Sequence, residues 1–115
     1  MKNILIILND PPYGTERNYN GLRLAKALSN EDSHVIVFLL ADAVACAKRG
    51  QKVPQGFYNM ELMLKSIIRN GEVLACGTCM DARGLTDDDI LQGAERSTMP
   101  VLSAHTLSAD KVLVF

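Results

Sequence analysis

Two cysteines, Cys76 and Cys79, are the side chains with the clearest chemical potential in this sequence. They lie in the stretch 71–85, GEVLACGTCMDARGL, directly after a short apolar run. A thiol reacts as the thiolate, which burial disfavours and which backbone N–H groups, helix N-termini and basic side chains favour. Because a short apolar run is typical of a buried strand, we expect both thiols at a strand end, where they form a candidate site.

The residues around this pair are expected to shape the site. Small residues after the first cysteine let the backbone turn close to the sulfur, and a helical turn is expected to begin over 81–83. Basic side chains are candidates for the positive charge that favours a thiolate. The loop after the first strand is a second source of site residues. The expected supporting residues are Gly77, Thr78 and Arg83 from the cysteine segment, and Tyr13, Thr15 and Arg17 from that loop.

The CxxC spacing leaves four interpretations open. A thioredoxin-like dithiol needs the motif at a helix start after the first strand of a βαβ unit. A zinc site needs four ligands, and only Cys46, His34 and His105 remain as distant partners. The two histidines also fit hydrogen-bonded structural roles, and we leave them outside the site. Inert buried thiols are the third interpretation. A single reactive thiol that carries a persulfide or sulfenate is the fourth.

Composition limits the class of protein. The 115 residues, 48% hydrophobic and 22% charged, predict one globular domain over 1–115. The formal charge of −1 and the scattered basic residues argue against nucleic-acid binding. The apolar run near the start is too short to span a bilayer, so we expect no membrane association. Three cysteines form an odd number, which favours reduced thiols and the cytoplasm. We expect no cofactor and no bound metal.

Near-continuous aliphatic runs predict strands that are buried on both faces of a parallel sheet. The expected strands are 3–8, 34–40, 73–75 and 111–115, with a further short strand within 92–98. Helical periodicity and capping residues predict the segments between them. The expected helices are 15–29 capped by Thr15, 41–48, 59–70 ended by a left-handed Gly71, one that starts at Thr86 before three aspartates, and 98–107.

This alternation predicts an α/β fold, an open and mostly parallel sheet with helices on both faces in three α/β/α layers. Ligands of such folds gather at the carboxyl ends of the strands. We therefore expect the loop 9–16, which follows the first strand, to lie beside the turn that carries Cys76 if the two strands are neighbours.

Three stretches of the sequence together resemble the DsrE/DsrF-like family, and the resemblance runs along essentially the whole chain. The stretches are NDPPYGTERNYNGLRLAKAL, CGTCMDARGL and GAERSTMPVLSAHTLSADKVLVF. The most specific match is a cysteine eight residues before the glycine of an Arg-Gly pair, here Cys76 before Arg83-Gly84. The resemblance implies the YchN-like fold of sulfur-relay proteins, a persulfide on Cys76 and a small homo-oligomer, commonly a trimer or hexamer.

The main hypothesis is a cytosolic sulfur-handling protein in which Cys76 accepts sulfur from a sulfurtransferase and passes it to an acceptor protein. Cys79 then serves as a resolving thiol or a stabiliser. A non-catalytic oligomeric scaffold with structural thiols and a CxxC dithiol redox protein are the alternatives. Whether the protein is an enzyme stays open.

Overall fold

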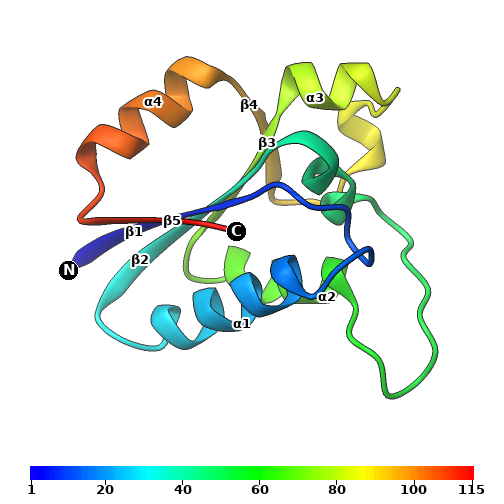
Figure 1. The fold of residues 1–115 in the computed structure, drawn as a ribbon, viewed down its shortest axis with the longest axis horizontal. Coiled ribbons are helices and arrows are strands. Elements are labelled where there is room, and N and C mark those ends of the chain that lie inside the picture. Colours follow the sequence, from blue (N-terminus) through cyan, green and yellow to red (C-terminus); the bar gives the residue numbers. More distant parts are fainter.

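Five parallel strands form the centre of the protein. The computed structural model describes residues 1–115. The strands are β1 (Lys2–Leu8), β2 (Ser33–Leu39), β3 (Glu72–Cys76), β4 (Ala94–Ser97) and β5 (Lys111–Val114). They pair in the order β4-β3-β2-β1-β5, and every pairing is parallel (Figure 1). The predicted parallel sheet is confirmed.

The middle strand is buried on both faces, as its aliphatic sequence predicts. Residues 35–39 of β2 are all buried, because helices cover both sides of the sheet at this position and β1 and β3 flank the strand. Apolar side chains therefore face inward on both sides, and no polar alternation is needed.

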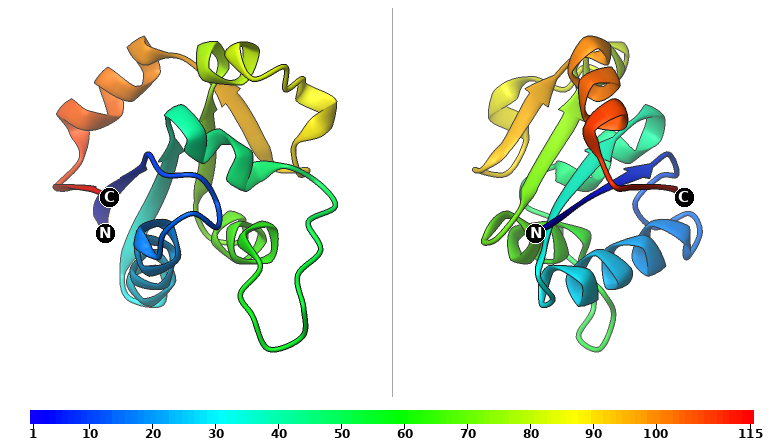
Figure 2. Two further views of the ribbon diagram at one scale, coloured as in Figure 1. Left: turned by 45° about the vertical axis from the view of Figure 1, so that its right-hand side comes forward. Right: turned by 90° about the vertical axis from the view of Figure 1, so that its left-hand side faces the viewer.

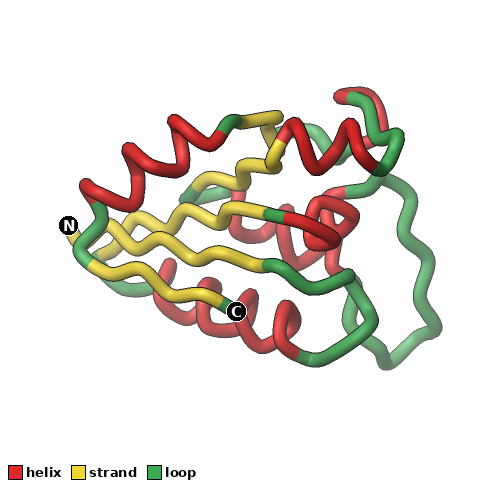
Figure 3. Tube along the Cα trace, turned by 45° about the horizontal axis from the view of Figure 1, so that its top comes forward, coloured by secondary structure: helices red, strands yellow, loops and turns green.

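Helices cover both faces of the sheet and complete three layers. They are α1 (Arg17–Ser29), α2 (Met60–Ile68), α3 (Gly77–Ala82) and α4 (Met99–Ser108). Figure 2 and Figure 3 show α1 and α2 together on one side of the strands and α4 on the other. α3 lies past the carboxyl end of β3 (Figure 1). The predicted arrangement with helices on both faces is confirmed. None of the helices has the length and apolar character needed to cross a bilayer.

Two short 3₁₀ helices lie in the connections between the main elements. η1 (Ala41–Ala47) follows β2 directly, and η2 (Asp87–Asp89) follows the loop after α3. The helix start predicted at Thr86 is confirmed as this single 3₁₀ turn, in which the Thr86 amide donates to Asp89 Oδ2 at 2.7 Å. That hydrogen bond lowers the pKa of Asp89. The three consecutive aspartates thus have a capping explanation.

Two predicted helix ends need correction. The first helix begins at Arg17 after Glu16, not at a Thr15 cap, although the Thr15 hydroxyl still accepts from the Arg17 amide at 3.3 Å. Gly71 is not the left-handed stop of the third helix, because its φ is not positive. A methyl group at position 71 would instead lie 2.2 Å from the Val35 carbonyl oxygen. Glycine is needed there because the chain enters β3 pressed against β2.

Replacing Gly71 with alanine is expected to reduce the free energy of unfolding by about 3 kcal/mol, the upper end of the cost of overpacking. The matched control is Gly50→Ala, at a left-handed glycine with open space around it, for which we expect a loss of about 1 kcal/mol. Urea denaturation of both variants measures the two losses. Equal losses would contradict the close approach of residue 71 to β2.

Candidate functional site

The Cys76 sulfur lies at the junction of β3 and α3. Cys76 is the last residue of the strand and the N-cap of the helix. Its Sγ accepts a hydrogen bond from the Cys79 amide at 3.4 Å, a bond of the kind that a capping side chain makes. The helix therefore starts at Gly77, earlier than the turn predicted over 81–83. Cys76 is only 7% exposed, so little of the residue is accessible to a reagent.

The second thiol is held by the first residue of η1, just after the neighbouring strand β2. Cys79 Sγ accepts a hydrogen bond from the Ala41 amide at 3.3 Å. Ala41 comes two residues after the end of β2 and has φ 50°, a left-handed conformation that costs a non-glycine residue about 1–2 kcal/mol. Because β2 pairs with β3, both thiols and this strained amide meet at one edge of the sheet. Backbone strain of this kind is common at functional sites.

Burial sets the resting protonation state of the Cys76 thiol. Burial is the main cause that raises the pKa of the Cys76 thiol above its usual value, and the hydrogen bond and charge of the Cys79 side chain raise it further. The Cys79 and Thr78 amides act in the opposite direction but do not offset burial. Cys76 is therefore a protonated thiol at neutral pH in this structure, and a partner or a covalent change has to favour its charged form.

Sequence reasoning missed Arg96, which packs closest to the turn after Cys76. A methyl group on Gly77 would lie 2.9 Å from Arg96 Nε, so glycine at 77 makes room for this side chain. Arg96 donates to Asp81 at 2.5 Å and lies 3.7 Å from Asp87. The hydrogen bond to Asp81 is the main cause that raises the Arg96 pKa, and a charged Cys76 adds to that effect. The only signal in the sequence was the place of Arg96 within the short strand expected over 92–98.

A hollow of about 470 Å³ opens beside this turn. The register pairs Cys76 with Ser97 on β4, and Ser97 lines the hollow together with the expected site residues Gly77 and Thr78. The start of α4 forms the far wall. The full lining is Gly77, Thr78, Asp81, Arg96, Ser97, Thr98, Met99 and Pro100. Cys76 itself does not line the hollow, but its chain neighbour Gly77 and its strand partner Ser97 do.

Arg83 was expected to support the thiolate, but its guanidinium bonds elsewhere. The Arg83 guanidinium donates twice to Asp42 Oδ1, at 2.8 and 3.0 Å, and once to the Cys79 carbonyl at 3.0 Å. These bonds tie the end of α3 to η1. Arg83 is thus a positioning residue for the cysteine turn, and its charge is already paired with Asp42.

The expected place of the first loop beside Cys76 is wrong, because β2 separates β1 from β3. Tyr13 stacks on Tyr58 with ring centroids 5.6 Å apart. Thr15 donates to Asp10 at 2.5 Å, and Arg17 lies 3.8 Å from the same carboxylate. The loop that holds Tyr13, Thr15 and Arg17 therefore forms a separate region at the carboxyl end of β1.

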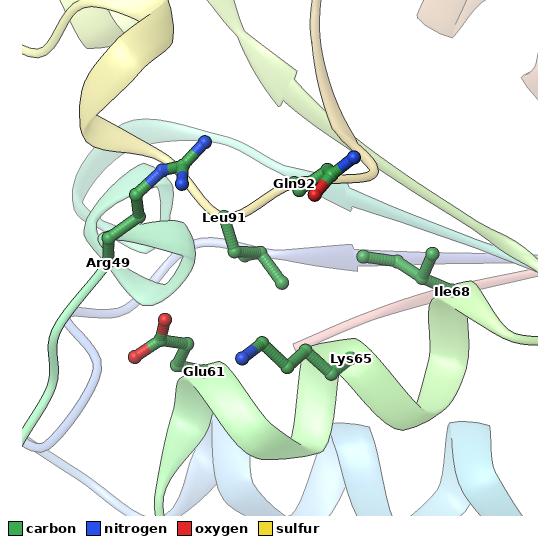
Figure 4. Close-up of a pocket in the computed structure, with 6 residues that line it drawn as sticks. All are labelled: Arg49, Glu61, Lys65, Ile68, Leu91 and Gln92. Carbon is green, nitrogen blue, oxygen red and sulfur yellow. The ribbon is translucent and has the colours of Figure 1, made fainter.

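The remaining thiol and a further hollow lie apart from the cysteine pair. Cys46 is fully buried, Asn18 donates to its sulfur at 3.3 Å, and burial raises its pKa to about 12. Figure 4 shows a second hollow of about 470 Å³, in which side chains of α2 face the segment before β4 and no cysteine takes part. No three His, Cys, Asp or Glu side chains converge to hold a metal ion.

Comparison with known proteins gives this geometry a family context. The model of the DsrE/DsrF-like family matches residues 2–115. YchN of Escherichia coli is 43% identical over 118 residues, with 100% of each chain covered. MK0008 of Methanopyrus kandleri is 37% identical over 97% of this chain and 93% of that protein.

Solved structures agree with the fold. The crystal structure of Escherichia coli YchN superposes with a TM-score of 0.94 at 42% identity, with 100% of both chains covered. MTH1491 of Methanobacterium thermoautotrophicum, a protein of unknown function, superposes with a TM-score of 0.72 at 13% identity, over 98% of this chain and 99% of that chain. At that identity the second likeness shows the fold alone.

Replacing Cys79 with alanine is expected to lower the pKa of Cys76, because the variant lacks the thiol whose hydrogen bond and charge raise it. Alkylation of Cys76 at neutral pH should then become several-fold faster, and its rate–pH profile should move to lower pH. Site-resolved mass spectrometry after iodoacetamide pulses measures both. Thr78→Ala, which keeps both thiols and the backbone amide, is the matched control. An unchanged Cys76 profile in Cys79→Ala would contradict the assignment.

Proposed function

Because the chain belongs to the DsrE/DsrF-like family, we propose that it handles sulfur, with Cys76 carrying a persulfide in sulfur transfer or relay. The single observation that carries the proposal is the position of the Cys76 sulfur. The sulfur lies at the carboxyl end of β3 and accepts a hydrogen bond from the Cys79 amide. Ser97, which pairs with Cys76 on β4, lines a polar hollow. Enclosure protects a reactive sulfur from water and small thiols, while the hollow leaves room for a donor.

The transfer balances without an added oxidant. The Cys76 thiolate attacks the outer sulfur of a donor persulfide, a bond forms from Sγ to that sulfur, and the donor leaves as a thiolate. The proton of Cys76 passes to solvent before attack. An acceptor thiolate then attacks the same outer sulfur, and Cys76 leaves as a thiolate. An S–S bond of about 2.05 Å carries the transferred sulfur outward from the nearly buried Sγ.

The second thiol has a defined part in this proposal. Attack of a Cys79 thiolate on Cys76 Sγ would form a disulfide and release hydrosulfide, so Cys79 is the resolving thiol if sulfur is discharged within the chain. The bond from Ala41 to Cys79 Sγ holds that sulfur in place. The contact between the two thiols also supports the second candidate function, a CxxC dithiol redox protein.

We also propose that the protein works as a homo-oligomer, a trimer or a hexamer. α4 carries no Asp, Glu, Lys or Arg, and the neighbouring edge strand β5 exposes further apolar side chains. The exposed apolar residues of this surface are Met99, Val101, Leu107, Val112 and Val114. Contact with a second copy would remove them from water, which favours association.

The domain organisation, the cellular compartment and the partners are also part of the proposal. The buried hydrophobic residues form one continuous cluster around the sheet, which supports a single domain over 1–115. Three free cysteines suit a reducing compartment, and we propose the cytoplasm. A sulfurtransferase donor and a sulfur acceptor protein are the proposed partners.

Incubation with a cysteine desulfurase and cysteine is expected to add one sulfur atom to Cys76. Intact-mass and peptide mass spectrometry measure the adduct and its position. Cys76→Ser, which keeps an oxygen acceptor for the Cys79 amide, should lose the adduct without unfolding, whereas Cys46→Ser should keep it.

The outcomes of this experiment separate the candidate functions. An adduct on Cys76 that persists in Cys79→Ala supports a sulfur carrier. A Cys76–Cys79 disulfide without added sulfur supports the redox protein. Absence of both products, with slow alkylation of the native thiols, sinks the sulfur-transfer proposal and favours the scaffold.

Replacing Leu107, which is 86% exposed, with glutamate is expected to break the oligomer, because a carboxylate in an apolar interface is costly. Analytical ultracentrifugation should give a small multiple of 12.6 kDa for the wild type and a lower mass for the variant. Leu62→Glu, at an exposed leucine on α2, is the matched control. A monomeric wild type would contradict the proposed assembly.

A further inference from the structure

All three tyrosines of the chain gather in one stack, away from the cysteine pair. Tyr58 stacks on Tyr19 with ring centroids 4.2 Å apart and on Tyr13 with centroids 5.6 Å apart. Tyr58 is thus the middle ring of a tyrosine stack formed by Tyr13, Tyr58 and Tyr19. The stack joins the loop after β1, helix α1 and the loop before α2. The proposed sulfur chemistry makes no use of it.

A hollow of about 380 Å³ lies against the Tyr13 end of this stack. Five of its six lining residues are apolar or aromatic, and Glu16 is the one charged residue among them. The lining is Tyr13, Glu16, Val53, Pro54, Phe57 and Tyr58. Phe57 is 70% exposed and Tyr13 is 42% exposed. Aromatic surface left in water beside a concave wall is what a ligand site shows.

Hydrogen bonds hold the Tyr13 wall of the hollow in place. The Tyr13 hydroxyl accepts from the Met60 amide at 3.1 Å and donates to the Gln51 side chain. The Gln51 amide group in turn donates to the carbonyls of Cys46 and Lys48, at 2.8 and 2.9 Å. Through these bonds the aromatic wall is anchored to the fully buried Cys46. The Tyr13 wall of the hollow is therefore preformed, which lowers the entropy cost of binding.

The charge of the lining selects the kind of ligand. The faces of aromatic rings attract cations, and the Glu16 carboxylate adds a full negative charge. The pKa of the Tyr58 hydroxyl is raised by burial first and by the nearby Glu16 second. The nearby Arg17 is paired with Asp10. At the other end of the stack, the Arg23 guanidinium carbon lies 5.5 Å from the Tyr19 ring centroid, so one face of the stack already holds a cation.

We propose that the hollow between Tyr13, Phe57 and Glu16 binds a compact organic cation, a quaternary ammonium or a protonated amine. The aromatic faces of Tyr13 and Phe57 contact the cationic head, and Glu16 balances its charge. The binding is independent of the cysteine pair, so the proposal stands or falls apart from sulfur transfer.

Choline is the probe for this site, and tyrosine fluorescence is the readout. The chain has three tyrosines and no tryptophan, and because all three tyrosines form the stack, the whole emission reports on it. Titration with choline chloride should give a saturable change with a Kd of about 1 mM, the scale of a few weak contacts. The uncharged alcohol with carbon in place of the choline nitrogen should bind at least about tenfold more weakly.

Two variants test the walls separately. Phe57→Ala and Glu16→Gln should each weaken choline binding by about fivefold or more, while Glu31→Gln, at an exposed acid after α1, should leave it unchanged. Because positions 16 and 57 are exposed, these variants should fold normally, which circular dichroism checks. Cys76→Ser should bind choline as the wild type does. No saturable change, equal binding of the uncharged isostere, or the same change with sodium chloride overturns the proposal.

Discussion

Parallel pairing between β2 and β3 is the constraint on which the candidate site depends. Their register joins Leu39 to Ala75, so the residues that follow each strand emerge together at the carboxyl edge. This register brings the Ala41 amide to the Cys79 sulfur. A slip of one residue would move every β2 side chain to the opposite face and place Phe38, which is fully buried, in a space packed for a different side chain. The close packing around the middle strand therefore secures the geometry of a polar site that the strand does not itself contain.

Opposing electrostatic effects act on the Cys76 sulfur within this frame. Backbone amides favour a charged sulfur, but burial disfavours it more strongly, and the basic side chains nearby are already engaged. Arg96 is paired with Asp81 and Arg83 with Asp42. The ion pairs thus shape the turn and contribute little net positive charge to the thiol. A resting thiol that becomes reactive only after its surroundings change suits a carrier that must not discharge at random.

Local patterns in the sequence predict the segments of this fold well, and long-range order poorly. Aliphatic runs locate β1 and β2 because burial leaves a signature within each run, and a similar run locates the edge strand β5 although most of its residues are exposed. Strand order has no such signature, since it depends on how the crossovers pack. For that reason the expected contact between the Tyr13 loop and Cys76 is wrong, and Arg96 was missed.

Side-chain direction and close backbone approach were equally inaccessible to sequence patterns. Arg83 has the expected position in the chain, yet its guanidinium turns to Asp42. Gly71 was expected for its backbone freedom, whereas the Val35 carbonyl excludes any side chain there. The position of Cys76 at a strand end, by contrast, follows from three apolar residues before it.

The atom proposed to react is also the atom that caps a helix. α3 has only six residues, and the bond from the Cys79 amide to Cys76 Sγ is the side-chain cap of its first turn. A covalent change on that sulfur alters the acceptor and therefore the helix. The last turn of α3 holds Asp81, which binds Arg96 on the next strand. The chemical state of a nearly buried sulfur is thereby linked mechanically to the ion pair between Asp81 and Arg96.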